Sequence, residues 1–96
     1  MKKFEVIVKP RAAKEIRRLE REAQSRTLAL LRTLAENPYT GEALSGDLKG
    51  FWSLHFTCKR TEYRIIYEIL AREVVVLIQK AGSRENIYKD FKRSKK

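Results

Sequence analysis

The spacing of the apolar residues changes once along this 96-residue chain, and the change limits the folds open to it. Between residues 10 and 37, apolar side chains recur every three or four positions, which is the spacing of helices that bury one face. Between residues 52 and 78 they alternate or run continuously, which is typical of half-buried and central strands. The sequence therefore predicts an α+β fold in which paired helices cover one face of a sheet.

The expected element order is β-α-α-β-β-β-α, a small antiparallel sheet with a helical hairpin packed on one face and a short C-terminal helix. Pro10 opens the helical region, because its missing N–H costs nothing in a first turn. We expect a bend or break at Gln24-Ser25, and the helical region to end before Asn37-Pro38. The strands are expected at residues 3–8, 52–57, 62–70 and 74–78, with a loop at 39–50, turns at 58–61 and 71–72, and the last helix after Gly82.

Charge and composition limit the kinds of partner that the chain can bind. The chain has 22 Lys and Arg residues against 12 Asp and Glu residues, and the net charge of +10 favours nucleic acid, an acidic protein or an anionic membrane. Its length predicts one domain over residues 1–96. The single cysteine, Cys58, excludes an internal disulfide and makes a cytoplasmic location the default. One cysteine and one histidine do not form a zinc site, and no apolar run predicts a membrane span or signal sequence.

The second face of the sheet is where we expect the functional residues. Trp52, Leu54 and Phe56 belong against the helices, so the residues between them point the other way. The residues expected to converge there on one concave patch are Ser53, His55, Arg64, Arg84 and Tyr88. This placement depends on the strand register, since a slip of one residue would send Ser53 and His55 into the core.

Two arginines, a histidine and a tyrosine suit chemistry on a phosphodiester. Cleavage by a neighbouring 2′-hydroxyl requires a base, an acid and cations that stabilise the extra charge on phosphorus, and it requires no metal or cofactor. Arginine is always charged and matches two phosphate oxygens, and histidine serves as acid or base near neutral pH. Two of these residues also have a structural alternative: His55 as a surface residue, and Tyr88 as a core residue like Tyr63 and Tyr67.

Several motifs, together with the element order, resemble the RelE/ParE superfamily of toxins from type II toxin–antitoxin systems, and the resemblance covers nearly the whole chain. The motifs are Leu44-Ser45-Gly46, the run from Glu62 to Tyr67 (Glu-Tyr-Arg-Ile-Ile-Tyr), Val74-Val75-Val76, and the run from Gly82 to Tyr88. The tyrosine–arginine run and the glycine–arginine–tyrosine run are specific as a pair and weak alone.

The resemblance implies a RelE-type mRNA interferase, an endoribonuclease that cuts mRNA in the ribosomal A site. It implies that Arg64 and Arg84 clamp the phosphate, that Tyr88 acts as base or orienting group, and that His55 acts as acid or base. Ser53 and His55 stand where that branch has lysines. RNA-backbone contacts are expected from Ser53, Lys49, Lys80, Lys89 and Lys92.

The resemblance also implies a cognate acidic antitoxin that forms a hetero-oligomer with the toxin and neutralises it, in addition to the ribosome and mRNA, with no membrane partner. Two alternatives remain open. A relative of the ParE branch would inhibit DNA gyrase without nuclease residues, and a catalytically weakened relative would only bind its antitoxin.

Overall fold

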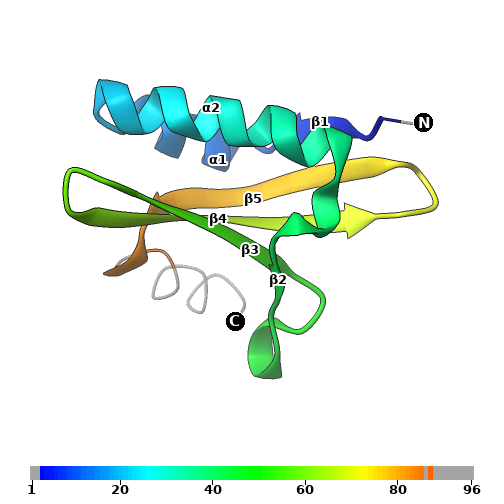
Figure 1. Ribbon diagram of the computed structural model, residues 1–96. Coiled ribbons are helices and arrows are strands. Elements are labelled where there is room, and N and C mark those ends of the chain that lie inside the picture. Colours follow the sequence, from blue (N-terminus) through cyan, green and yellow to red (C-terminus); the bar gives the residue numbers. More distant parts are fainter. Residues whose placement is uncertain (1–2, 86, 88–96) are drawn as a thin grey trace.

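The computed structural model describes residues 3–85 and 87. Most of these residues form a five-stranded sheet with two helices on one face (Figure 1). The strands are Glu5–Val8 (β1), Glu42–Ala43 (β2), Trp52–Cys58 (β3), Thr61–Leu70 (β4) and Val75–Ser83 (β5). They lie in the order β1-β5-β4-β3-β2. The predicted α+β fold is confirmed. The expected antiparallel sheet contains one parallel pair, because β1 lies parallel to β5. β1 thereby gives the apolar strand β5 a neighbour on the edge away from β4.

The two helices are Pro10–Arg17 (α1) and Arg21–Glu36 (α2). The break between them lies at residues 18–20, so the expected break at Gln24-Ser25 is wrong. The backbone of Glu20 is extended (φ −63°, ψ 158°), and its carbonyl accepts the N–H of Gln24 to begin α2. Within the described part of the chain, neither helix has the length and apolar character to cross a bilayer.

The main core lies between the helices and the sheet. Tyr67 is fully buried there, and its hydroxyl donates to the Pro38 carbonyl oxygen at 2.7 Å. Trp52 and Leu54 pack against this core, as expected, and the half-buried Tyr63 stacks on Phe56. The buried members are Ala12, Ile16, Leu31, Leu34, Ile65, Tyr67, Val76, Ile78 and Ala81.

A second, smaller core covers part of the other face of the sheet. It consists of Leu48, Ile66 and Ile87, with Leu44 and Phe51 packed against it. Leu48 ends a 3₁₀ turn at Gly46–Leu48, in a segment that was expected to be only a loop. The same segment contains β2, whose two residues pair with Ser53 and Trp52. A strand of two exposed residues leaves no apolar pattern by which the sequence could predict it.

The edge of β5 changes neighbour where β1 ends. Val8 is the last residue of β1 and lies opposite Ile78, and beyond that point α1 flanks β5. Glu15 of α1 accepts the backbone N–H of Ala81 at 3.0 Å, in place of a neighbouring strand. With this support β5 continues to Ser83, five residues past the predicted end. Helical backbone begins at Arg84, and the predicted C-terminal helix beyond Ile87 lies outside the described residues.

Candidate functional site

A carboxylate joins the two arginines that the sequence analysis singled out. Glu62 and Arg64 lie two residues apart on β4 and therefore on the same face of the sheet. The Arg64 Nη2 and Nε atoms lie 2.9 and 3.1 Å from Glu62 Oε2. Arg84 follows the last residue of β5, and its Nη1 lies 3.6 Å from Glu62 Oε1. The fold thus brings Arg64 and Arg84 to one anionic group.

The strand register places His55 beside this group. His55 on β3 lies directly opposite Arg64, which in turn lies opposite Gly82 on β5. Side chains of directly opposed residues on neighbouring strands have Cβ atoms about 4.5–5.5 Å apart and face the same way. His55 is exposed, and among residues 3–85 and 87 nothing lies within 4 Å of where a Cβ atom at Gly82 would be. The described part of the chain therefore places His55 and Arg64 in one row across the sheet and leaves space beside them at Gly82.

A hollow of about 240 Å³ adjoins the arginines, between the β3–β4 turn and the end of β5. Its lining residues are Arg60, Thr61, Glu62, Ser83, Arg84 and Glu85. Arg84 has 64% of its side chain exposed, whereas Arg64 has 19%. An anion in the hollow can therefore reach the exposed Arg84 side chain, while the mostly covered Arg64 contacts Glu62 and is not among the residues that line the hollow.

Two of the predicted RNA-binding residues are buried in the structure. Ser53 has 1% of its surface exposed, and it lies opposite Glu42 of β2 on one side and opposite Ile66 of the second core on the other. Lys80 has 2% exposed, and its ammonium group donates to Glu15 Oε2 at 2.9 Å. The expectation that these two side chains lie at an open surface is wrong.

The other predicted positions are exposed or undescribed. Lys49 is exposed on the segment that covers the second face, at the end of β3 away from the β3–β4 turn. Tyr88, Lys89 and Lys92 lie outside the described residues. The structure therefore brings together His55, Arg64 and Arg84, and leaves Lys49 at a separate position along the same face.

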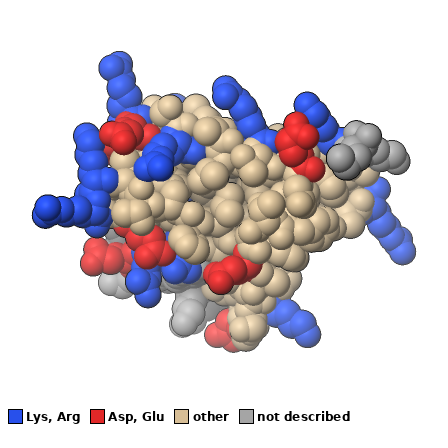
Figure 2. All heavy atoms as spheres, in the orientation of Figure 1, with Lys and Arg blue, Asp and Glu red and all other residues tan. Residues whose placement is uncertain are grey.

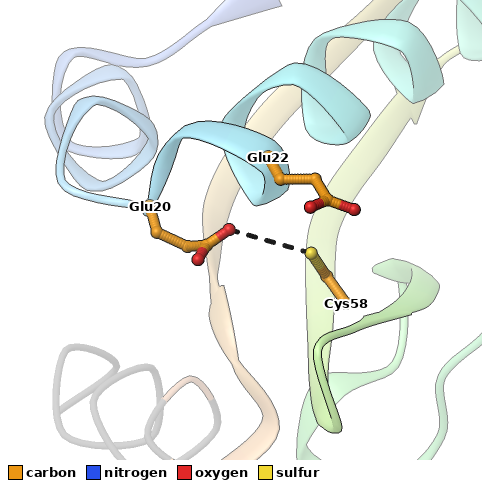
Figure 3. A group of neighbouring side chains, drawn as sticks. All are labelled: Glu20, Glu22 and Cys58. Carbon is orange, nitrogen blue, oxygen red and sulfur yellow. Dashed lines mark hydrogen bonds between the residues drawn. The ribbon is translucent and has the colours of Figure 1, made fainter.

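One group of potential metal ligands occurs among the described residues: Glu20, Glu22 and Cys58 (Figure 3). Lys59 already neutralises it, since its Nζ lies 3.3 Å from Glu20 Oε2 and 4.0 Å from Glu22 Oε1. The hydrogen bond from Lys59 lowers the pKa of Glu20, and burial raises the pKa of the Cys58 thiol. A protonated thiol is a poor metal ligand and a poor nucleophile, so the group serves to join the start of α2 to the β3–β4 turn.

Charge is spread around the molecule as well as gathered at the site. Figure 2 shows Lys and Arg side chains projecting from several sides of the visible face, with Asp and Glu side chains between them. The +10 net charge follows from the whole sequence, and it attracts anions over a longer range than the two arginines alone.

A family model for the ParE-like toxins of type II bacterial toxin–antitoxin systems matches residues 6–92. The chain belongs to this family. It is thus a toxin of a type II toxin–antitoxin system within the RelE/ParE superfamily, as the motifs indicated. No curated protein sequence matches this toxin.

Solved structures support the same fold for the toxin. The RelBE2 toxin–antitoxin complex from Mycobacterium tuberculosis superposes with a TM-score of 0.73 at 22% identity, over 88% of this chain and 94% of that one. A mutant of the Escherichia coli toxin RelE in the free state gives 0.72 at 22% identity, over 90% and 87%. The intact E. coli RelBE complex gives 0.69 at 20% identity, over 82% and 94%. At this level of identity the likeness establishes the fold.

The sequence analysis missed Glu62 as a member of the toxin's site. The signal was present, because residues two apart on a strand share a face and Glu62 precedes Arg64 by two. The arginine and tyrosines of this run do not by themselves indicate the carboxylate. Period-two alternation applied to every residue of β4 would have placed the carboxylate beside the guanidinium.

Proposed function

We propose that this toxin is a ribosome-dependent endoribonuclease that cleaves mRNA by attack of the 2′-hydroxyl, without a metal. The observation that carries the proposal is the convergence of Arg64 and Arg84 on one anionic group, beside the exposed His55. Two guanidinium groups in this arrangement can stabilise the additional negative charge of a pentacoordinate phosphorus. The RelE/ParE resemblance supplies the reaction class, and the geometry is consistent with it.

In the proposed reaction, the 2′-oxygen bonds to phosphorus as the bond to the 5′-oxygen breaks, which leaves a 2′,3′-cyclic phosphate and a free 5′-hydroxyl. Arg64 and Arg84 bind the non-bridging oxygens. His55 transfers a proton as acid or base, and Tyr88, by resemblance, takes the role of base or orienting group. Lys49, Lys89 and Lys92 are proposed to bind the RNA backbone, and the buried Ser53 and Lys80 are withdrawn from that role.

The proposed partners are the ribosomal A site with its mRNA, and a cognate acidic antitoxin in a hetero-oligomer in the cytoplasm. Two of the similar structures are toxin–antitoxin complexes, which supports an antitoxin partner. The net charge of +10 suits both an acidic antitoxin and RNA, since both are anionic.

The test is primer extension on a reporter mRNA after brief induction of the toxin. We expect in-frame cuts within translated codons, and a loss of about 100-fold or more in Arg84→Ala, because removing one transition-state donor typically costs that much. Arg72→Ala is the matched control, since Arg72 is exposed in the turn at the far end of β4 and β5. Cleavage that persists in Arg84→Ala would refute the assignment.

The family description favours one second candidate, inhibition of DNA gyrase, because the matching family model is that of ParE-like toxins. This hypothesis predicts that the toxin arrests growth while mRNA stays intact, and that it inhibits DNA supercoiling by purified gyrase. It also predicts that Arg84→Ala retains toxicity. A toxin with neither effect that still binds its antitoxin would be the catalytically weakened relative.

A further inference from the structure

The anionic group that the two arginines share belongs to the protein itself. Glu62 has 29% of its side chain exposed and contacts Arg64 through one carboxylate oxygen and Arg84 through the other. A carboxylate and a phosphodiester offer guanidinium groups the same feature, a pair of oxygens that share one negative charge. Glu62 therefore occupies the position in which the proposed mechanism places the phosphate.

The two contacts differ in strength. Arg64 is mostly buried and lies within 3.1 Å of Glu62 Oε2 through two nitrogens, so this pair is well defined. Arg84 is mostly exposed, and its 3.6 Å separation from Oε1 is longer than a charge-assisted hydrogen bond. An entering anion can therefore displace Glu62 from Arg84 at low cost, while the contact between Glu62 and Arg64 is kept.

We propose that Glu62 is a resident competitor for the phosphate site: it binds the arginine pair in the free toxin, and the phosphate of RNA must displace it from Arg84. This inference rests on the proposed function, because it assigns a role at the same site. Its physical basis is that a phosphate bound at Arg84 adds a second negative charge close to the first, and the repulsion lowers affinity. Removing the Glu62 charge should then strengthen anion binding.

The experiment is a titration with an uncleavable 2′-deoxy trinucleotide at fixed ionic strength, followed by NMR through the Nε–H signals of Arg64 and Arg84. We expect Glu62→Gln to bind about tenfold more tightly than the wild type, because the removed charge lies in direct contact with both arginines. Glu62→Asp retains the charge and should bind as weakly as the wild type. Adding Arg84→Ala to Glu62→Gln should abolish the gain.

The matched control is Glu68→Gln, which makes the same change of charge on the same strand and face. Glu68 accepts a hydrogen bond from Gln79, which a glutamine can also accept, and lies six residues from Glu62, roughly 20 Å along the strand. We expect its affinity to match the wild type. A similar gain in Glu68→Gln would mean that net charge, and not the site, controls binding, and this would overturn the proposal.

Other outcomes separate this inference from the proposed function. Equal or weaker binding by Glu62→Gln, with thermal unfolding unchanged, would overturn the inference, since Glu62 would then only hold the arginines in place. Failure of all variants to bind would overturn it too. Tighter binding by Glu62→Gln, without any mRNA cleavage by the wild type in cells, would support the competitor role and reject the endoribonuclease.

Discussion

Lys80 and Glu15 form an ion pair at the edge of β5 that serves the fold. The Lys80 side chain is almost completely buried, so its charge requires a partner, and Glu15 Oε2 lies 2.9 Å from its Nζ. The other oxygen of Glu15 accepts the Ala81 N–H. One carboxylate therefore ends the strand pairing at this edge and neutralises a buried cation.

Glu15→Gln should lower the free energy of unfolding by about 3 kcal/mol, because it removes the carboxylate charge that contacts the buried Lys80 cation. The measurement is urea denaturation of the purified toxin. Lys80→Met combined with Glu15→Gln should recover most of the loss, since the amide can still accept the Ala81 N–H. An unchanged midpoint in Glu15→Gln would contradict the structural role given to this pair.

Tyr67 should make the free energy of unfolding of the toxin depend on pH in the alkaline range. Burial raises the pKa of Tyr67, so the unfolded chain loses this proton first, near pH 10. The buried neutral phenol makes its full contribution to the free energy of unfolding below that pH. As the pH rises towards the folded-state pKa, the free energy of unfolding falls by up to about 1.4 kcal/mol per pH unit. Comparing urea unfolding of the wild type and Tyr67→Phe from pH 8 to 11 isolates this slope.

Tyr67→Phe should also cost about 1 kcal/mol at neutral pH, because the Pro38 carbonyl loses its donor. The other titrating groups, including Lys59, whose pKa is raised by Glu20, remain in both proteins and cancel in the difference. Curves that run parallel across the whole pH range would show that the phenol titrates equally in the folded and unfolded states.

At the residue scale, strand periodicity predicted which side chains share a face but not which are accessible. His55 and Arg64 lie on one face, opposite each other, as the alternation required. Ser53 shares that face, yet it is buried where β2 pairs with β3 and where the second core lies on the neighbouring strand. The charge of Lys80 indicates an exposed side chain, whereas the residue is buried against a carboxylate 65 residues away. Such contacts between distant segments leave no local pattern.

Among the elements, the short strand β2 depends on a close approach of three segments. Gly41 precedes β2, and a Cβ atom there would collide with the Tyr67 hydroxyl and lie 2.6 Å from the Ser53 carbonyl oxygen. Its φ of −84° is open to any residue, so lack of space is the reason for glycine here. The β2 segment can approach β3 and β4 only because this position has no side chain.

Gly41→Ala should therefore destabilise the toxin by about 1–3 kcal/mol, the usual cost of forcing atoms into a packed site. Urea denaturation monitored through Trp52 fluorescence would measure the change. Gly82→Ala is the control for stability, because a Cβ atom there would meet none of the described residues within 4 Å. Equal stability of the wild type and Gly41→Ala would mean that β2 can move away from β3 without loss.

Elements with many residues were predicted well, and their ends less so. The α1–α2 break at residues 18–20 contains no proline or glycine, and each of its residues is acceptable inside a helix, so the sequence carried no signal for it. The β3–β4 turn was expected over four residues. It consists of Lys59 and Arg60 with positive φ values of 50° and 71°, a conformation normally marked by Asn-Gly.

For the whole molecule, the net charge of +10 predicted an anionic partner but not its identity. Charge acts over distances of about 10 Å at ordinary ionic strength, and it does not distinguish RNA from an acidic protein. The identity of the family came from the motifs and the family model instead. Composition therefore limits the class of partner, and the local sequence motifs indicate the family.

Binding of single-stranded RNA should weaken with salt in proportion to the phosphates contacted. If Lys49, Arg64 and Arg84 each neutralise one phosphate, log Kd should rise with log[salt] with a slope of about 2, and Arg84→Ala should reduce it by about 0.7. Fluorescence anisotropy with an uncleavable oligonucleotide between 50 and 200 mM KCl measures both slopes. Salt-independent affinity would contradict phosphate contacts by these residues.

The site side chains stand apart from both cores, and this separation bears on how such toxins diverge. His55 is exposed, Arg84 lies beyond the end of β5 with most of its side chain in solvent, and the two cores consist of other residues. Substitutions at these positions leave the packing untouched, so they cost little folding stability. Natural selection can therefore exchange one toxic chemistry for another while the scaffold stays constant, and a lineage can lose its activity without losing its shape.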